Sequence, residues 1–515
     1  MMAARKLQES SSLLDAAAAR AAAPAKLVAR QRPLLAAMAA LGVLGLSGCA
    51  IGPDFVRPAS TLPGQYAVSS GTEAATETTT ETAAIEPDWW KQFKDPVLDD
   101  LLDKALVQNA DLRIAIARVE QAEAAAREAG GALLPQIDAQ ASGSRARYSS
   151  MNAIPLSGST PVQRDARSAA LTTSYELDVW GRVRRGYESV RASALASQYS
   201  RDAIRLSVAG LVTNSYLALR AYDAQLAVAD ESLATRKTTL ELIRTRVDAG
   251  LVSPLDQHQA EGNLAAIAAQ TASLRLQRAQ TEHQLALLVG APDLHIAPGD
   301  LRQLPLPPLP PAGLPSSLVQ ARPDVRQAEE NLVSANAGIG VAKAGYFPKF
   351  TLTGSLGSES KTLENLFSAG AGTWALGLGA LMPIIDFGRT SARVDQATAQ
   401  QKQSLVAYQN TLQTAFKEVK DALVSVRENA AGEAAQAARV EASAKALKIA
   451  QLRYDAGYSG YLDVLEAQRS NNDSLQSLIS TRQARLTAAV DLFKALGGGW
   501  KDEIAPEGRR ADAAR

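Results

Sequence analysis

At residues 246–250 the chain reads Arg-Val-Asp-Ala-Gly, and 207 residues later, at 453–457, it reads Arg-Tyr-Asp-Ala-Gly. Neighbouring motifs repeat with the same spacing: Leu255-Asp256 returns as Leu462-Asp463, and Trp180-Gly181-Arg182 returns as Phe387-Gly388-Arg389. Chance matches in an alanine-rich chain would not keep one spacing over about 110 residues. The period is far longer than the 20–50 residues of solenoid repeats, so it indicates a duplicated half-molecule.

The N-terminal region predicts a bacterial lipoprotein. Arg30 and Arg32 precede a short apolar stretch that ends in Leu46-Ser47-Gly48-Cys49. A basic region, a short apolar core and small residues before a cleavage site are typical of a secretory signal. The last four residues also resemble the bacterial lipobox, in which the cysteine is lipidated. We therefore expect a signal peptide over 1–48 and a lipid on Cys49, the only cysteine, rather than a buried structural thiol. Ala50 after it favours the outer membrane, by resemblance to lipoprotein sorting in enteric bacteria.

Two segments change from a helical to a β period. Residues 136–178 and 349–384 each alternate apolar with small or polar side chains, which predicts one β-hairpin in each half. Membrane β-barrel strands alternate in this way, but so do strands of a soluble sheet, and alternation alone leaves both open. No segment after the signal offers 18 consecutive apolar residues, so the sequence predicts no transmembrane helix. A mature chain that spans a membrane must then do so with strands.

Long proline-free stretches follow the hairpins. The segments 186–249 and 389–456 would each rise about 95–100 Å as continuous helix, at 1.5 Å per residue. Gly250 and Gly457 are placed to end these helices, and Ser253-Pro254 is placed to begin the next one. The following helix has an apolar seam with steps of three and four that Arg278 interrupts. We expect packed helical hairpins at about 186–290 and 388–497 rather than two ordinary bundles.

The domain organisation follows from these segments. We expect a lipidated N-terminal segment and linker at 49–95. Two repeats, at 96–299 and 316–497, are joined by a proline-rich linker at 300–315 and followed by a charged C-terminal tail at 498–515. The two hairpins supply four strands, and a membrane sheet cannot leave two edges unpaired. Chains must therefore share one closed sheet. The sequence does not choose between two chains with eight strands and three chains with twelve.

Several motifs resemble the TolC-type outer-membrane efflux factors, most closely the lipoprotein branch labelled NodT. The resemblance rests on Cys49-Ala50-Ile51-Gly52-Pro53-Asp54-Phe55-Val56-Arg57-Pro58, on Trp89-Trp90, on the two Asp-Ala-Gly turns, and on Tyr461-Leu462-Asp463-Val464-Leu465-Glu466-Ala467-Gln468. It implies a homotrimer with a twelve-stranded β-barrel in the outer membrane and an α-helical tunnel in the periplasm. It also implies a periplasmic adaptor (membrane fusion) protein and an inner-membrane transporter, usually of the resistance-nodulation-division type.

The same resemblance assigns roles to residues at the turns. Asp256, Asp463 and Glu466 match the carboxylates of the periplasmic gate, and Tyr454 matches the tyrosine that hydrogen-bonds the Asp256 position. The family's intersubunit arginine is replaced here by Ser459. Gly250, Leu251, Val252, Gly457 and Tyr458 resemble the adaptor-docking motif. The alternatives are a solvated helix face for the carboxylates and plain helix capping for the glycines. The changes between the two copies cluster at the turns, so we expect any moving part in the second copy.

No enzyme site is predicted, and no cofactor or metal site. The three histidines have no partners at metal-ligand spacing, and no phosphate-binding loop is present; Gly338-Ile339-Gly340 lies inside a helical pattern. A net charge of +1 gives no basic footprint for nucleic acid. We therefore expect an outer-membrane exit duct for small molecules, anchored by lipid and extending into the periplasm. The alternatives are the outer-membrane component of a type I protein secretion system and a lipid-anchored periplasmic coiled-coil scaffold.

Overall fold

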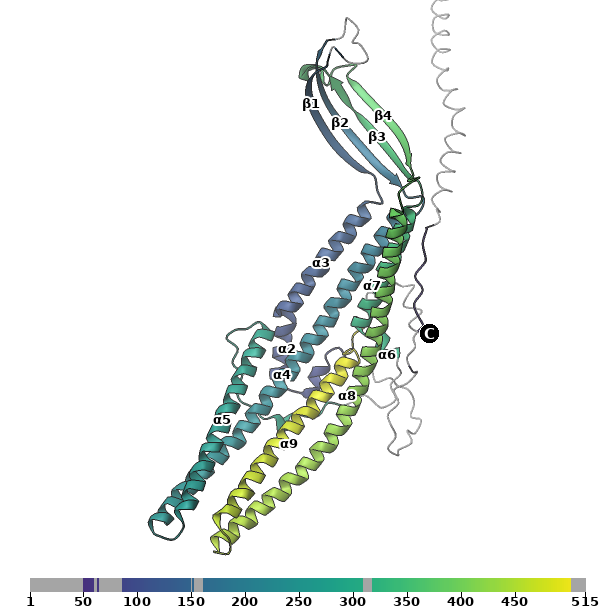
Figure 1. The fold of residues 1–515 in the computed structure, drawn as a ribbon. Helices are drawn as coiled ribbons and strands as arrows, with labels where there is room; N and C mark the ends of the chain where they lie inside the picture. The colour runs from purple at the N-terminus through teal and green to yellow at the C-terminus, as the bar shows by residue number, and fades with distance from the viewer. Residues whose placement is uncertain are drawn as a thin grey trace, which may run out of the picture. The chain divides into compact units, whose positions relative to one another are not determined.

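A computed structural model describes residues 50–59, 63, 86–149, 151, 161–308 and 317–501 of the 515-residue chain (Figure 1). Helices dominate it, and four strands form one sheet, which confirms the predicted class, mainly α with a small β part. The α-helices are α2 (Pro96–Gln108), α3 (Ala110–Gly131), α4 (Arg182–Asp248), α5 (Pro254–Val289), α6 (Ser317–Gln320), α7 (Pro323–Ala344), α8 (Arg389–Asp455) and α9 (Tyr461–Ala495). The strands are β1 (Gln136–Arg147), β2 (Gln163–Leu177), β3 (Lys349–Ser360) and β4 (Gly372–Leu381). The short 3-10 helices are η2 (Trp89–Phe93), η3 (Leu301–Gln303) and η4 (Leu363–Asn365).

The two long helices, α4 and α8, have 67 residues each and begin within four residues of the predicted positions. Among the described helices, none combines the length and the apolar character that crossing a membrane requires. Contacts divide the chain into two compact units, and each unit contains segments from both repeats. Unit 1 comprises Met1–Phe55, Glu128–Ser189 and Asn336–Ala399, and unit 2 comprises Val56–Arg127, Val190–Ala335 and Gln400–Arg515.

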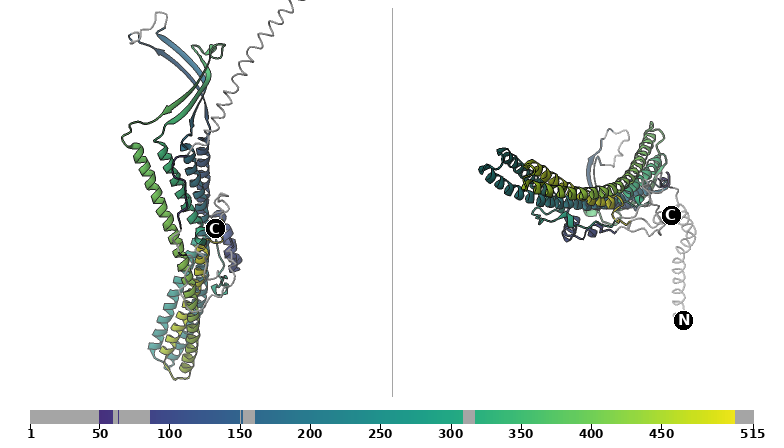
Figure 2. Two further views of the ribbon diagram at one scale, coloured as in Figure 1. Left: turned by 90° about the vertical axis from the view of Figure 1, so that its right-hand side faces the viewer. Right: turned by 90° about the horizontal axis from the view of Figure 1, so that it is seen from below.

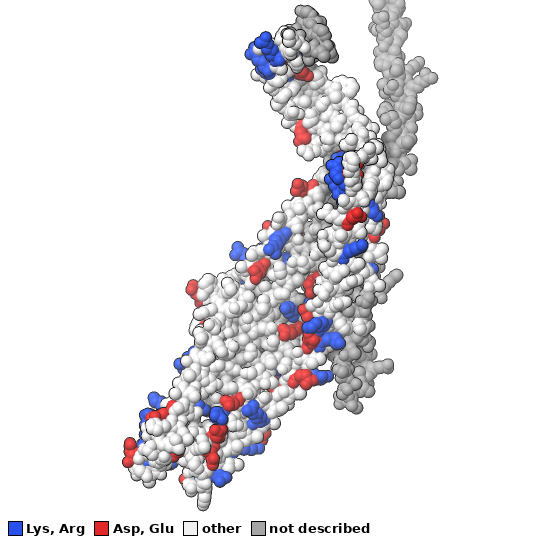
Figure 3. Space-filling view, in the orientation of Figure 1, with Lys and Arg blue, Asp and Glu red and all other residues white. Residues whose placement is uncertain are grey.

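Unit 1 contains the sheet, whose order is β1-β2-β3-β4 with every neighbouring pair antiparallel. Each repeat supplies one hairpin, and the two hairpins meet where β2 pairs with β3. The strands curve along their length (Figure 2). Leu171, Leu356 and Trp374 are cross-strand partners, so they lie on one face of the sheet, and all three are exposed. Few charged side chains lie over the strands in Figure 3. The sheet therefore has an uncovered apolar face and two edge strands, β1 and β4, with one partner each.

The segment that follows Cys49 lies against α7 in unit 1; Cys49 itself is outside the described residues. The backbone N–H of Ile51 donates to the carbonyl of Trp180 at 3.0 Å, and the Asn336 amide donates to the carbonyl of Pro53 at 2.9 Å. A Cβ on Gly340 would lie 2.7 Å from the Ile51 carbonyl oxygen. Of the two glycines inside α7, Gly338 and Gly340, only Gly340 therefore leaves room for this segment.

Gly340→Ala is expected to loosen the N-terminal segment, and Gly338→Ala is its matched control. Both changes favour the helix by about 0.5–1 kcal/mol, because alanine loses less backbone entropy than glycine. At Gly338 an added Cβ has nothing within 4 Å, whereas at Gly340 it meets the backbone of the segment. Hydrogen–deuterium exchange of the peptide over residues 50–58 should become faster in Gly340→Ala only. Equal protection in both variants would contradict the role given to Gly340.

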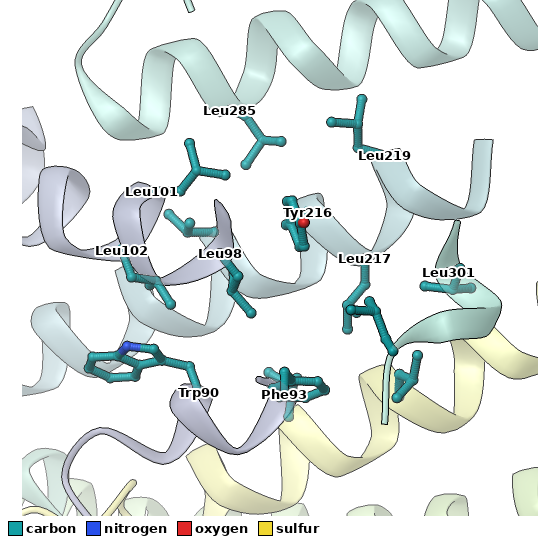
Figure 4. Packing of buried hydrophobic residues seen from close by; sticks show 14 of the residues in the cluster. Trp90, Phe93, Leu98, Leu101, Leu102, Tyr216, Leu217, Leu219, Leu285 and Leu301 are labelled. Carbon is teal, nitrogen blue, oxygen red and sulfur yellow. The ribbon is translucent and has the colours of Figure 1, made fainter. Parts of the chain in front are cut away.

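The core of unit 2 is built around the segment before and within α2. Asp95 caps α2, accepting a hydrogen bond from the Val97 backbone N–H at 2.9 Å, and Pro96 is the first helical residue, as predicted. η2 and α2 bury their apolar side chains against α4, α5 and α9 (Figure 4). The fully buried members include Trp89, Phe93, Leu98, Leu101, Leu102, Tyr216, Leu217, Leu219, Leu285 and Leu301. This core explains the Trp89-Trp90 motif as a packing feature.

A buried ion cluster joins α4 and α5 in unit 2. The Asp223 carboxylate lies 2.8 Å from Arg278 Nε and 3.3 Å from Arg220 Nη1, and it accepts the Gly299 backbone N–H at 3.0 Å. Arg278, which interrupts the apolar seam in the sequence, also donates to the carbonyl of Ile296 at 2.6 Å. The break in the seam is thus the point where the segment after α5 is tied to both helices.

Candidate functional site

The two turns singled out in the sequence lie at the same end of unit 2, where α4 meets α5 and α8 meets α9 (Figure 1). Both close in the same way. Gly250 N–H donates to Val247 O at 2.8 Å and Leu251 N–H to Arg246 O at 2.8 Å; Gly457 and Tyr458 make the equivalent bonds at 3.0 and 2.8 Å. This is the Schellman motif, which needs a left-handed residue, and the two glycines have φ of 69° and 77°. The repeat therefore extends to the hydrogen bonds of the turns.

The side chains of the expected docking motif differ in exposure. Leu251 is 74% exposed and Tyr458 is 80% exposed, which places an apolar side chain on each turn. Val252 does not share this exposure, because it packs against a small apolar cluster beneath the turns. Space around both glycines is open: an added Cβ on Gly250 or Gly457 would have nothing within 4 Å. The exposed surface at the turns therefore consists of Leu251, Tyr458, Gly250 and Gly457.

The cluster beneath the turns, which we call the tip cluster, connects the two helical hairpins, the first formed by α4 and α5 and the second by α8 and α9. Its buried members are Leu240, Ile243, Ala260, Tyr461 and Val464. Tyr461 is the large side chain at its centre, and burial raises its pKa to about 12. The sequence analysis assigned it no role. The available signal was its position, because it stands where the first copy has Pro254. Because a tyrosine stands where the first copy has the proline that starts α5, α9 contributes a large ring to the tip cluster.

Tyr454 packs between the hairpins. Its ring centroid is 5.7 Å from that of Tyr461, and the Arg246 guanidinium carbon of the first hairpin is 5.6 Å from its centre. Its hydroxyl is buried and has no hydrogen-bond partner among the described residues. The hydrogen bond to Asp256 implied by the family resemblance is therefore absent, and Tyr454 contacts the first hairpin through its ring instead.

The three expected gate carboxylates lie near the starts of α5 and α9. Asp256 is in the first turn of α5 and Asp463 in the first turn of α9, where the helix dipole favours a negative charge. Asp463 is exposed, and Asp256 is partly buried. Glu466, one turn further along α9, forms an exposed ion pair with Arg469 at 3.1 Å. The structure thus brings Asp256, Tyr454 and Asp463 to the same end of unit 2, with Glu466 one turn away.

The two helical hairpins, α4–α5 and α8–α9, differ in how their second helices begin. In the first, Ser253 caps α5, and Glu261 on α5 accepts a hydrogen bond from Arg244 on α4 at 2.9 Å. Hydrogen bonds from Arg244, Gln257 and His258 lower the pKa of Glu261 to about 2. The second hairpin starts α9 at Gly460 without a side-chain cap. Three buried polar atoms there, the hydroxyls of Tyr454 and Ser459 and the Gln468 carbonyl oxygen, have no partner among the described residues.

Both signs of charge gather around the turns in the face shown in Figure 3. Ser459, at the position of the family's arginine, adds no charge, and its hydroxyl is one of the unpartnered atoms. An unpaired buried polar group costs about 1–3 kcal/mol, so the buried hydroxyls of Tyr454 and Ser459 weaken the packing at the second turn. Two similar helical hairpins thus share one small apolar core, the tip cluster.

Comparisons with known proteins show the family of this chain. The family model described as outer membrane efflux protein matches residues 101–291 and 314–498. The solvent efflux pump outer membrane protein SrpC of Pseudomonas putida is 34% identical over 464 residues, covering 89% of this chain and 97% of SrpC. The cation efflux system protein CusC of Escherichia coli is 32% identical over 464 residues, again covering 89% and 97%. The crystal structure of the Campylobacter jejuni CmeC outer membrane channel has a TM-score of 0.82 at 28% identity, covering 91% of this chain and 98% of CmeC.

These similarities extend over nearly the whole of both partners, and they match a family of efflux ducts rather than of enzymes. They agree with the duplicated helices, the four-stranded sheet and the outer-membrane location expected from the sequence. The chain therefore belongs to the outer membrane efflux protein family.

Proposed function

We propose that three copies of this chain form the exit duct of a tripartite pump, together with a periplasmic adaptor protein and an inner-membrane transporter of the resistance-nodulation-division type. The observation that carries the proposal is the sheet of unit 1. It has an exposed apolar face and two edge strands that each lack one partner. Unpaired backbone groups are costly in lipid, so the edges of neighbouring copies pair and the shared sheet closes. A lipid on Cys49 holds each copy at the outer membrane.

The cargo that we propose is small toxic molecules. The names of two relatives, a solvent efflux protein and a cation efflux protein, support this class without choosing within it. Deletion of the gene is expected to sensitise the cell to organic solvents, drugs or metal cations, and the wild-type gene to restore resistance. A deletion strain with unchanged resistance that no longer secretes a protein would instead favour a type I secretion role. A strain with neither defect would leave only the scaffold alternative.

We propose further that the turns carry the gate and the docking surface. Asp256, Asp463, Glu466 and Tyr454 form the gate, with the second hairpin as its moving part. The support is local to the turns: Ser253 caps α5, whereas α9 begins without a side-chain cap, and the hydroxyls of Tyr454 and Ser459 are buried without a partner among the described residues. The second turn therefore opens at lower cost than the first. Gly250, Leu251, Gly457 and Tyr458 form the exposed docking surface for the adaptor, with Val252 supporting it from the tip cluster.

Tyr461→Ala is expected to open the gate, whereas Tyr454→Phe is not. Truncation of a buried aromatic side chain costs about 3–5 kcal/mol and removes the centre of the tip cluster. Tyr454→Phe deletes only a hydroxyl that has no partner. Single-channel conductance in planar bilayers should rise in Tyr461→Ala and stay near wild type in Tyr454→Phe. A large rise in Tyr454→Phe would mean that a hydrogen bond through this hydroxyl closes the gate.

Neutralising the gate carboxylates is expected to reduce preference for cations. Rings of carboxylates in a narrow mouth attract cations and repel anions. Asp463→Asn combined with Glu466→Gln should shift the reversal potential in a salt gradient toward zero. The matched control is Asp473→Asn, a change on α9 about two turns beyond Glu466. If the control shifts the reversal potential as much as the double variant, the selectivity does not arise at the turns.

A further inference from the structure

Unit 2 contains a cavity of about 280 Å³, away from the hairpin turns, where the segment before α2 meets α4 and the chain after α9. Three of the five tryptophans in the sequence line it: Trp89, Trp90 and Trp500. Three cationic side chains line it as well: Arg201, Arg205 and Lys501. Neither the gate nor the docking surface uses any of these residues. The concentration of aromatic and cationic side chains in one small cavity requires a separate explanation.

The aromatic walls are held rigidly. Trp89 is fully buried and stacks on Phe493 with centroids 5.5 Å apart, and its ring meets that of Trp90 edge to face at 5.7 Å. Trp500 is fixed by a hydrogen bond from its indole N–H to Asp202 at 3.1 Å. Gly498, with φ of 58°, lets the chain pass close to the Trp89 ring. Trp89 and Trp90 are themselves buried, so a ligand that enters the cavity meets Trp500 and Leu206, which this core holds in place.

The charges of the cavity are not balanced. Arg201 is paired with Asp202 at 2.7 Å, which accounts for the one carboxylate that lines the cavity. Arg205 and Lys501 have no ion-pair or hydrogen-bond partner within the described part of the chain. The cavity thus has an excess of positive charge at its rim.

We propose that this cavity binds a small carboxylate with a flat apolar body. The acid group pairs with Arg205 and Lys501 at the rim, and the apolar body packs against Trp500 and Leu206. The volume sets the size of the ligand. Pockets for drug-sized molecules occupy about 300–1,000 Å³, so about 280 Å³ suits a single ring with an acid group. The site is independent of the cargo path proposed above, because it stands on residues that the gate and docking surface do not include.

A pair of matched probes tests the proposal on the full chain in detergent. 4-Fluorophenylacetate and 4-fluorophenylacetamide have nearly the same shape and differ in charge, and fluorine NMR reports the binding of each through line broadening. We expect broadening with the acid and at least tenfold weaker binding of the amide, because an unpaired cation gains only from the carboxylate. Equal broadening by both probes, or none by either, would overturn the proposal.

Variants then locate the binding. Arg205→Gln combined with Lys501→Gln is expected to weaken binding of the acid about tenfold. Arg118→Gln is the matched control, because Arg118 is exposed on α3 and does not line the cavity. An equal loss in the control would show general attraction of anions to the surface and refute a built site.

The remaining competitor is the chain itself, because the acidic residues Asp502 and Glu503 follow Lys501 directly. Asp502→Asn combined with Glu503→Gln should leave the affinity for the acid unchanged. A severalfold gain in affinity would identify these carboxylates as the occupants and overturn the proposal of a separate ligand.

Discussion

Gly250→Asn and Gly457→Asn are expected to abolish export while leaving the folded protein in the outer membrane. Asparagine tolerates the left-handed conformation that both turns require, so the Schellman hydrogen bonds survive. An added Cβ at either glycine meets nothing within 4 Å of its own chain, so only a second protein would be obstructed. Efflux of a fluorescent dye should fall more than tenfold, the loss expected when the centre of a small docking surface is blocked.

The control for this prediction is Gly388→Asn. Gly388 also has a positive φ, of 84°, and open space around its Cβ, but it lies in unit 1 at the start of α8. This variant should export normally. If Gly250→Asn and Gly457→Asn also export normally while Gly250→Val does not, the glycines serve only to close the turns. The adaptor would then dock at another surface.

The second large effect concerns the buried ion cluster. Asp223→Ala is expected to lower the free energy of unfolding by about 3–5 kcal/mol, because it leaves the buried Arg220 without a carboxylate and Arg278 with Glu282 alone. The Asp223 side chain is only 2% exposed. Loss of its bonds also loosens the segment after α5, which is tied to α4 by the bond from Gly299 to Asp223 and to α5 by the bond from Arg278 to Ile296. Thermal unfolding of the purified protein, followed by circular dichroism, measures the change.

Asp230→Ala is the matched control for burial. Asp230 lies seven residues further along α4 and pairs with Arg275 on α5 at 3.0 Å, so the chemistry and the two helices are the same. Its side chain is 51% exposed, and an exposed pair contributes at most about 1 kcal/mol. A similar loss of stability in both variants would contradict the view that burial, rather than the ion pair as such, makes Asp223 important.

Local signals in the sequence predicted the elements well. The period of alternation located the strands, and the proline-free stretches located α4 and α8 to within a few residues. Glycine at the ends of the long helices predicted turns that the structure closes by Schellman bonds. These features depend on backbone preferences of a few consecutive residues, which is why one sequence is enough to find them.

Contacts between distant segments were harder to predict. The hydrogen bond from Tyr454 to Asp256 that the resemblance implied is absent among the described residues, and Val252 of the docking motif packs against the tip cluster. Tyr461 was not recognised as the centre of that cluster, since its partners on α4 lie about 220 residues earlier. A side chain's partner depends on how two hairpins pack, and no local pattern encodes the angle or the depth of that packing.

The sequence by itself determined the duplication, the helical hairpins, the four strands and the family, because each follows from periodicity, turn residues or motifs read along the chain. Only the tertiary structure decided that Gly340 makes room for the N-terminal segment, that Asp223 is clamped by two arginines, and that three tryptophans meet in one cavity. The physical reason is the same in each case. These features arise from close packing of segments far apart in the chain, where a few tenths of an ångström decide which groups touch.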